Sequence, residues 1–305
     1  MNNSVSLFFG YGNGSFKTQI IISTRANPIS LVANDFNQDG YMDFGVVHNT
    51  NSSLGISLGL GNGTFQTQIN FLICNNSYGL AVGDFDNDNI LDLAVANNYW
   101  TNVGLLLGYG NGIFRSQINI GTGNYPTILD VADFNHDNQL DFAIANWGNN
   151  NVGIHLGCAD GTFRSSMTFA TGINPWGLAI GDFNNDNNID IVTTNCGDNT
   201  MSVLLNYGNG TFKSQINYTI SGCSYEVSTG DLNGDNYIDI ITIGTYSAYI
   251  NVFLGYGNGS FSRATSFVTD SNPLSLALDD FNEDGRLDVA TVHYGGTVNI
   301  FLNAC

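Results

Sequence analysis

Long apolar runs, basic residues and closely spaced cysteines are all scarce in this sequence. No apolar run approaches the roughly 18 residues that cross a membrane, so we expect no membrane insertion. Lysine and arginine number 7 against 26 acidic residues, a balance that excludes the basic surface required for nucleic-acid binding. The five cysteines show no Cys-x-x-Cys spacing, which argues against a zinc site. The N-terminus has no charged segment with a long apolar core behind it. We therefore expect that a secretory signal has been removed, or that the chain is a segment of a longer protein.

Charged residues of both signs are also few, and turn-forming residues take their place. They make up 11 % of the chain, against roughly 25 % in an average globular protein. Glycine is abundant, with 37 residues, and asparagine is frequent throughout. Apolar residues make up 43 % and aromatic residues 12 %, which is enough for a packed core. Helical periodicity is absent, so the composition predicts an all-β protein of short strands and tight turns.

One unit of 49 residues recurs along the whole chain. The sequence Asp-Phe-Asn, or a close variant of it, begins at residues 35, 84, 133, 182, 231 and 280. A second pattern, Gly-x-Gly-Asn-Gly-[Ser/Thr]-Phe, begins at Gly10, Gly59 and Gly255, and in variant form at Gly108, Gly157 and Asn206. A fixed period of this length indicates a repeat architecture.

Each unit has the apolar pattern of four short strands. In the fourth unit, residues 178–180 lead into an acidic loop and residues 191–193 leave it. Residues 201–205 then run into the glycine-rich turn, and a last strand follows Phe212. Asn-Gly is typical of two-residue hairpin turns, and four antiparallel strands per repeat are typical of a propeller blade. We predict one domain over residues 1–305, an all-β propeller of six four-stranded blades. Seven blades, with partial blades at the termini, are the alternative.

An acidic loop joins the first two strands of every unit, with the pattern Asp-x-[Asn/Asp]-x-Asp-[Gly/Asn]-x-x-Asp. We number loop positions from its first Asp. The predicted metal ligands are the side chains at positions one, three, five and nine and the main-chain carbonyl at position seven. They are Asp35, Asn37, Asp39, Tyr41 and Asp43; Asp84, Asp86, Asp88, Ile90 and Asp92; Asp133, Asn135, Asp137, Gln139 and Asp141; Asp182, Asn184, Asp186, Asn188 and Asp190; Asp231, Asn233, Asp235, Tyr237 and Asp239; and Asp280, Asn282, Asp284, Arg286 and Asp288.

The ligand chemistry of these loops predicts calcium, up to six ions per chain. Calcium prefers six to eight oxygen ligands, and the loop of an EF-hand begins with the same arrangement at positions one, three and five. Position six is always Gly or Asn, the residues that tolerate a left-handed conformation. The loops hold 19 carboxylates, which equals the net charge of −19, so the excess charge lies where cations would neutralise it. Solvated, Asn-rich turns are the alternative interpretation, but turn propensity does not explain an Asp at positions one, five and nine in every copy.

The units resemble the FG-GAP (VCBS-type) repeats, the family that includes the propeller of integrin α subunits. The resemblance covers essentially the whole chain, and it implies a propeller with calcium bound in the hairpins that join the first two strands of the blades. Propellers of that family commonly have seven blades, whereas six loops are present in this sequence. The family includes adhesion modules, lectins and domains attached to enzymes, so the resemblance does not fix an activity.

Three further groups of residues stand out from the repeat. Aromatic residues between the loops suit sugar stacking or protein binding, with packing between blades as the alternative; the candidates are Tyr78, Trp100, Trp147, Trp176 and Tyr225. Glycosylation sequons that turn geometry does not explain begin at Asn51, Asn75 and Asn217. Cys196 and Cys223 lie in connections on one face of the fourth blade, where a disulfide is predicted.

The sequence therefore predicts a secreted or cell-surface recognition module that binds a glycan or an extracellular protein. A structural subunit of a larger assembly or filament is one alternative, and the non-catalytic propeller of a carbohydrate-active enzyme is another. Catalysis is not expected, because the histidines are scattered and few acids lie outside the loops. The strand count suggests that the last blade takes its fourth strand from the N-terminus. A spare third-position strand would then be displaced and frayed, form a partial seventh blade, or dock on a neighbouring molecule and so support self-assembly through the termini.

Overall fold

The computed structural model describes residues 3–49, 52–245 and 247–303. These residues form an all-β fold of the six-bladed propeller class, as the sequence predicts. A short 3-10 turn, Asn98–Trp100 (η2), lies between two of the strands. The chain divides into two compact units. Unit 1 comprises Met1–Leu7, Ile20–Asn149 and Gly153–Thr168; unit 2 comprises Phe8–Gln19, Asn150–Val152 and Phe169–Cys305.

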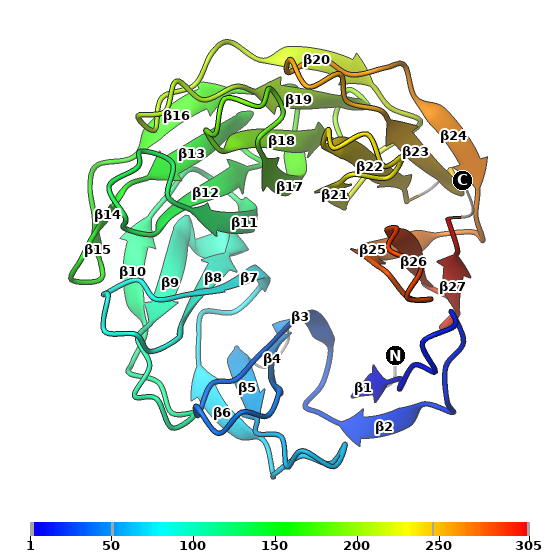
Figure 1. The fold of residues 1–305 in the computed structure, drawn as a ribbon. Coiled ribbons are helices and arrows are strands. Elements are labelled where there is room, and N and C mark those ends of the chain that lie inside the picture. Colours follow the sequence, from blue (N-terminus) through cyan, green and yellow to red (C-terminus); the bar gives the residue numbers. More distant parts are fainter. Residues whose placement is uncertain (1–2, 50–51, 246, 304–305) are drawn as a thin grey trace. The chain divides into compact units, whose positions relative to one another are not determined.

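Five sheets have four antiparallel strands each, in chain order from the first strand to the fourth (Figure 1). They are β3 (Pro28–Asn34), β4 (Asp43–His48), β5 (Ser53–Ser57) and β6 (Ile69–Leu72); β7 (Ser77–Gly83), β8 (Asp92–Asn97), β9 (Asn102–Leu106) and β10 (Ile118–Gly121); β11 (Pro126–Ala132), β12 (Asp141–Asn146), β13 (Asn151–His155) and β16 (Met167–Ala170); β17 (Pro175–Gly181), β18 (Asp190–Asn195), β19 (Thr200–Leu204) and β20 (Ile216–Thr219); and β21 (Val227–Gly230), β22 (Asp239–Gly244), β23 (Tyr249–Phe253) and β24 (Thr265–Val268).

Three smaller sheets complete the described structure. The sixth blade consists of β25 (Pro273–Asp279), β26 (Asp288–His293) and β27 (Val298–Phe301). The glycine-rich turn of the third blade forms a two-stranded sheet of β14 (Gly157–Cys158) and β15 (Thr162–Phe163). At the N-terminus, β1 (Ser4–Leu7) pairs with β2 (Ile20–Ser23).

The pairing of the terminal strands corrects one expectation from the sequence. β2 pairs with β1, in the register Ser4↔Ser23, and does not become the fourth strand of the sixth blade in the described part of the chain. The local partner is favoured because β1 and β2 are joined by their own glycine-rich turn, and closing a short loop costs little entropy. β27 accordingly pairs with β26 alone among the described strands.

The core of the five four-stranded blades lies on their second and third strands, which are largely buried. All residues of β8 and β18 are buried, for example, as are most of those in β9 and β19. A strand with one solvated face alternates between buried and exposed residues. These strands show no such alternation because both faces of the sheet are covered. The first strand of each blade contacts the first strand of the next blade in the same unit. These strands are β3, β7 and β11 in unit 1, and β17, β21 and β25 in unit 2.

The glycine-rich turn of one blade packs on the acidic loop of the blade before it. In unit 1, the main-chain N–H of Gly112 donates to the carbonyl of Phe36 (3.0 Å), and in unit 2 that of Gly259 donates to Phe183 (2.9 Å). The phenylalanine of the glycine-rich turn also contacts the acidic loop of the blade before it. The ring of Phe261 packs edge to face on that of Phe183, with ring centroids 5.5 Å apart. The loops are thereby held between neighbouring blades of a unit, on well-packed aromatic residues.

Candidate functional site

The acidic loops share one hydrogen-bond pattern that brings their carboxylates together. At position one, Asp182 accepts hydrogen bonds at Oδ1 from the N–H of Asp186 (3.1 Å) and at Oδ2 from that of Asn187 (2.8 Å). At position five, Asp186 accepts a bond at Oδ1 from the N–H of Asn188 (2.9 Å). Corresponding bonds occur in the other five loops. The backbone therefore wraps around the side chains at positions one and five.

Position three distinguishes the second loop from the others. The third loop carries Asn135, whose side-chain amide donates to the position-five carboxylate Asp137 (3.0 Å). Similar bonds join Asn37 to Asp39, Asn233 to Asp235 and Asn282 to Asp284. The second loop carries Asp86 instead, and Asp84, Asp86 and Asp88 each place one ligand oxygen within 4.8 Å of the others.

The Asp86 carboxylate is left without a partner for one of its oxygens. Its Oδ1 is buried and makes no hydrogen bond in the described structure. Burial, and after it the charges of Asp88 and Asp84, raise the pKa of Asp86 above its ordinary value. A buried oxygen among like charges is unfavourable unless a cation or a proton neutralises it. The donor set at this point is the one that calcium prefers, so the residues fit the predicted ion.

The aspartate at position nine has a role that the sequence did not indicate. Asp43 is buried, and it accepts a bond at Oδ2 from the N–H of Phe36 (2.9 Å) and at Oδ1 from that of Gly59 (2.6 Å). The same two bonds recur at Asp92, Asp141, Asp190, Asp239 and Asp288. The first five of these carboxylates join their acidic loops to the start of the glycine-rich turn, and Asp288 joins the sixth loop to Asn303, which follows the third strand of its blade. A glycine is required at position 59 because a Cβ there would lie 2.3 Å from the Met42 carbonyl oxygen.

Burial perturbs the position-nine carboxylates in the direction expected for a charge removed from water. It raises the pKa of Asp92 and of Asp141 to about 6, and that of Asp190 to about 7, while the two main-chain amides oppose the shift. Each oxygen accepts one of these amides and keeps a second lone pair. A cation in the loop would favour the ionised form further.

Two loop positions adopt the left-handed conformation, of which the sequence indicated one. Position six has φ between 60° and 84° in all six loops, carried by Gly or Asn. Position four has φ near 60° as well, although it carries Gln38, His136 and Glu283 in three of the loops. Such residues are uncommon at positive φ. The shared geometry shows that the loop's hydrogen bonds impose this conformation on whatever residue stands there.

The aromatic candidates lie at the other end of the strands, near the start of the first strand of a blade or in the connection between second and third strands. In unit 2, the rings of Trp176 and Tyr225 are 4.8 Å apart at 41°. In unit 1, the indole N–H of Trp100 donates to Asn75 Oδ1, and Trp147 packs edge to face on Tyr125 at 5.8 Å. Tyr78 is half-buried on β7. The structure therefore divides the predicted residues between the two units and adds Tyr99 and Tyr125, which the ligand candidates omitted.

The structure forms a disulfide between Cys196 and Cys223, the pair that the sequence predicts. Their sulfurs are 1.98 Å apart and the bridge closes a segment of 27 residues. Cys74 and Cys158 are free thiols. Of the three glycosylation candidates, Asn51 lies outside the described residues, and Asn75 and Asn217 are exposed.

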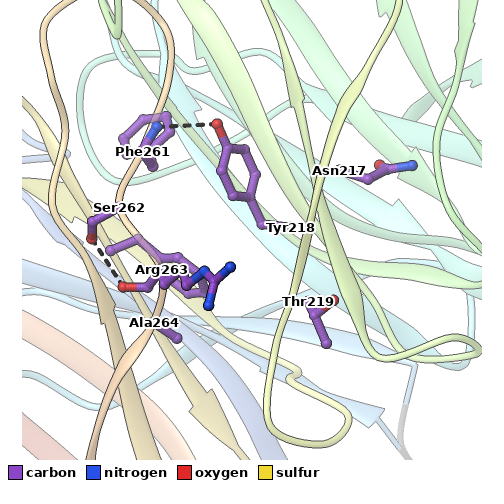
Figure 2. A pocket seen from close by; sticks show the side chains of 8 residues that line it. Asn217, Tyr218, Thr219, Phe261, Ser262, Arg263 and Ala264 are labelled. Atoms are coloured by element: carbon purple, nitrogen blue, oxygen red, sulfur yellow. Dashed lines mark hydrogen bonds between the residues drawn. The ribbon is translucent and has the colours of Figure 1, made fainter.

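Figure 2 shows a pocket beside β20, in which the Tyr218 hydroxyl accepts a hydrogen bond from the Phe261 N–H (3.0 Å). Tyr218 also packs edge to face on Phe253 and Phe261, so this side chain belongs to the blade's packing. The Asn217 side chain points away from Tyr218 in the same view, and its Oδ1 accepts a bond from Ser202 Oγ (3.0 Å). Asn217 thus remains accessible at the outer strand of the fourth blade, and glycosylation there stays a prediction.

Three titratable groups outside the loops have a pKa that burial shifts strongly. Burial lowers the pKa of His155 to about 4, and its ring stacks on Phe142 at 4.3 Å. Burial raises the pKa of Glu226 to about 7 and that of Asp130 to about 6. These two acids belong to different units. Among the described residues, no hydrogen bond joins the side chain of any of these three groups to a nucleophilic side chain.

Comparison with known proteins identifies the repeat. A family model described as "FG-GAP-like repeat" matches residues 1–46, 35–95, 84–144, 137–193, 182–242 and 231–291. Comparison with curated protein sequences gives no significant match. No helix among the described residues has the length and apolar character needed to span a bilayer.

Several solved propellers are similar in fold. The structure of BBS1N in complex with ARL6DN has a TM-score of 0.69 at 11 % identity, covering 99 % of this chain and 86 % of that one. A lectin from Agrocybe aegerita that recognises non-reducing terminal N-acetylglucosamine has a TM-score of 0.63 at 16 % identity, covering 98 % and 90 %. Virginiamycin B lyase from Staphylococcus aureus has a TM-score of 0.67 at 15 % identity, covering 98 % and 88 %. At these identities the similarity establishes the fold alone.

Proposed function

The chain belongs to the FG-GAP-like repeat family, and from this premise we propose that it is an extracellular, calcium-binding recognition module for a glycan or a protein. Calcium is structural in this proposal, and the chain performs no catalysis. The carrying observation is the group of Asp84, Asp86 and Asp88, whose converging oxygens include one that is buried without a hydrogen-bond partner.

Calcium would be held by the side chains at positions one, three, five and nine and by the carbonyl at position seven. The bound ion supplies the positive charge that offsets the repulsion among these carboxylates. At the predicted ligand positions the second loop has four carboxylates where the others have three, and it lacks the Asn-to-Asp bond found in four of the other loops. We therefore expect the second loop to bind calcium most tightly, because affinity rises with the charge of the ligand set.

Metal analysis tests this part of the proposal. Protein equilibrated with millimolar calcium should retain several ions per chain, and the variant Asp86→Asn should weaken one site without removing the others. Fewer than about three ions per chain in the wild-type protein would contradict the proposal. Asp198→Asn is a matched control, because Asp198 is an aspartate outside the loops.

Recognition is proposed for the ends of the strands that lie away from the acidic loops. Trp176 and Tyr225 in unit 2, and Trp100 and Trp147 in unit 1, place aromatic rings among asparagine-rich connections there. The fold supports such a role, because similar propellers include a complex with another protein and a glycan-binding lectin. Monomeric behaviour on gel filtration together with selective binding on a glycan array would support it. Turnover of a polysaccharide by the purified protein would overturn the non-catalytic assignment.

A structural subunit is the second candidate, and the edge of the sixth blade favours it. β27 pairs on one side only in the described structure, and Val298 and Leu302 are 43 % and 46 % exposed. Unpaired strand edges are templates for pairing with another chain. Concentration-dependent assembly that is abolished by deleting residues 1–10 or by Val298→Pro would establish this candidate. A monomer at every concentration would exclude it.

A further inference from the structure

One position of the repeat has a left-handed backbone in five of the six copies, and in four of those five the residue is one that suits this conformation. This position lies eight residues before the first loop aspartate. It is occupied by Asn27, Asn76, Asn174 and Asn272, with φ between 55° and 60°. In the fifth blade it is Cys223, which forms the disulfide. In the third blade it is Tyr125, with φ 54°.

A tyrosine is poorly suited to this backbone. Asparagine visits the left-handed region readily, whereas a bulky side chain there is an outlier that persists only when something compensates for the strain. The main-chain contact at this position does not need the tyrosine. The Tyr125 carbonyl accepts a bond from Trp147 N–H (3.1 Å), just as the Asn174 carbonyl accepts one from Cys196 N–H (3.0 Å). The main-chain hydrogen bond therefore does not explain why this position is a tyrosine, and the explanation must lie in the contacts of the Tyr125 side chain.

That side chain is the centre of an exposed aromatic cluster. Its ring lies between Tyr99 (5.9 Å, 87°) and Trp147 (5.8 Å, 89°). Tyr125 is 42 % exposed and Tyr99 is 63 % exposed, so the cluster faces solvent on one side. Gly148 makes room for it, because a Cβ at that position would come within 2.7 Å of the Tyr125 ring. All four residues belong to unit 1.

The surroundings of the cluster are polar but uncharged. The connections that carry it, residues 97–102, 121–127 and 146–151, contain no Lys, Arg, Asp or Glu. They are rich in asparagine, and the N–H of Asn124 bonds Asn149 Oδ1. Amides offer donors and acceptors together, which matches the hydroxyl groups of a sugar. A charged ligand would find no counter-ion in these connections, and a protein hot spot usually adds Arg to its aromatics.

We propose that Tyr99, Tyr125 and Trp147 form a binding site for a neutral glycan. The rings contact the apolar C–H face of a sugar, and the neighbouring asparagines bond its hydroxyl groups. The inference rests on the proposed recognition function and names the site and ligand class for it. Tyr125 is the specificity-determining residue, and its backbone strain is retained because the ring is needed for binding.

The variant Tyr125→Asn distinguishes a role of Tyr125 in binding from a role in stability, because asparagine is the residue found at this position in four other blades. We expect its melting temperature to equal or exceed that of the wild-type protein, and its affinity for the glycan to fall at least about tenfold, as expected on losing a central stacking ring. The probes are neutral methyl glycosides of glucose, galactose, mannose and N-acetylglucosamine, measured by saturation-transfer NMR, with sialyllactose as the charged comparison. Tyr256→Ala removes an aromatic residue of similar exposure (58 %) in unit 2 and should leave binding unchanged.

Three results would overturn the inference. One is a fall in melting temperature for Tyr125→Asn with unchanged binding, which would make the tyrosine structural. Another is a wild-type protein that binds none of the four neutral glycosides, or that prefers sialyllactose. The third is glycan binding that survives Tyr125→Asn but is lost in Trp176→Ala, which would preserve the recognition function and place the site in unit 2. Calcium stoichiometry measured on the same samples tests the metal-binding part of the proposed function separately.

Discussion

Replacing Asp190 by asparagine tests whether the position-nine carboxylate acts as a structural clamp independent of metal. Its two oxygens accept bonds from the N–H groups of Phe183 (3.0 Å) and Asn206 (2.7 Å), and the residue is fully buried. Asparagine offers one acceptor oxygen and one NH₂ group, so one of the two amides would face a donor. Because aspartate and asparagine have nearly the same volume, the substitution creates no cavity, and a loss of stability would come from the changed hydrogen bonds.

The expected cost follows from the bonds that are lost. A hydrogen bond to a charged group contributes about 1.5–3 kcal/mol, and a buried N–H without a partner costs about 1–3 kcal/mol. These two quantities overlap, and the substitution also removes the cost of burying a carboxylate whose pKa is raised to about 7. We therefore expect Asp190→Asn to lower the free energy of unfolding by roughly 2–4 kcal/mol at about pH 8, where the carboxylate is ionised.

Urea unfolding followed by tryptophan fluorescence measures this change, since Trp176 lies in the same blade. The experiment is run in calcium and again in a chelator. The clamp predicts a similar loss in both conditions, whereas a residue that acts as a ligand alone would destabilise the protein in calcium and have no effect in the chelator. A loss below about 1 kcal/mol in the chelator would therefore refute the clamp. Asp182→Asn is the comparison, because Asp182 also accepts two main-chain amides but is only half-buried, so we expect it to lose less stability in the chelator than Asp190→Asn.

Three further predictions use other parts of the chain. Chelating calcium should lower the melting temperature, because an ion that binds the folded state alone stabilises it by mass action; an unchanged melting curve in excess chelator would contradict a structural role for the ion. Removing the disulfide with Cys196→Ser and Cys223→Ser should cost about 3.5 kcal/mol from the loss of a loop of 27 residues, measured by urea unfolding with the single Cys74→Ser variant as control; a change under about 1 kcal/mol would show that the segment is already ordered by its neighbours. Burial raises the pKa of Glu226 to about 7, so the folded state favours its protonated form, and the stability that this gives below about pH 4.5 is lost as the pH rises through 7. Glu226→Gln should therefore be more stable than the wild-type protein by roughly 1–3 kcal/mol at about pH 8 and equal to it at about pH 4, and parallel pH profiles would rule this out.

The sequence predicts the parts of this structure that depend on local patterns. Six copies of one unit make the strands, the glycine-rich turns and the acidic loops visible, because each copy repeats the same spacing. The left-handed residue at position six follows from the restriction to Gly and Asn, and the structure confirms it in all six loops. The pairing of Cys196 with Cys223 also follows from the repeat, since both lie in connections at the same end of one blade.

The remaining features depend on contacts between distant segments. The clamp at position nine needs an amide 16 residues further along the chain, and nothing in the loop itself specifies which amide approaches. The left-handed backbone at position four is imposed on Gln38 and His136 by the bonds around them, against the preference of those residues. The pairing of β2 with β1 was missed because a count of strands does not say which of two equivalent partners is closer.

A residue that differs from those at the same position in the other copies of the repeat is informative when the other copies show which residue the backbone there favours. The position eight residues before the loop has a left-handed backbone in five copies, and asparagine occupies four of them. Cys223 departs from the asparagine pattern in the fifth blade and gains a covalent bond to Cys196. Tyr125 departs from it and gains two edge-to-face contacts with exposed or half-exposed rings, which a chain selected for stability alone would obtain elsewhere without strain. The disulfide accounts for the first departure within the fold, and a ligand for the aromatic cluster accounts for the second. A protein in which Asn replaces Tyr125 with no loss of any binding would show that strain at this position has been tolerated and has not been selected.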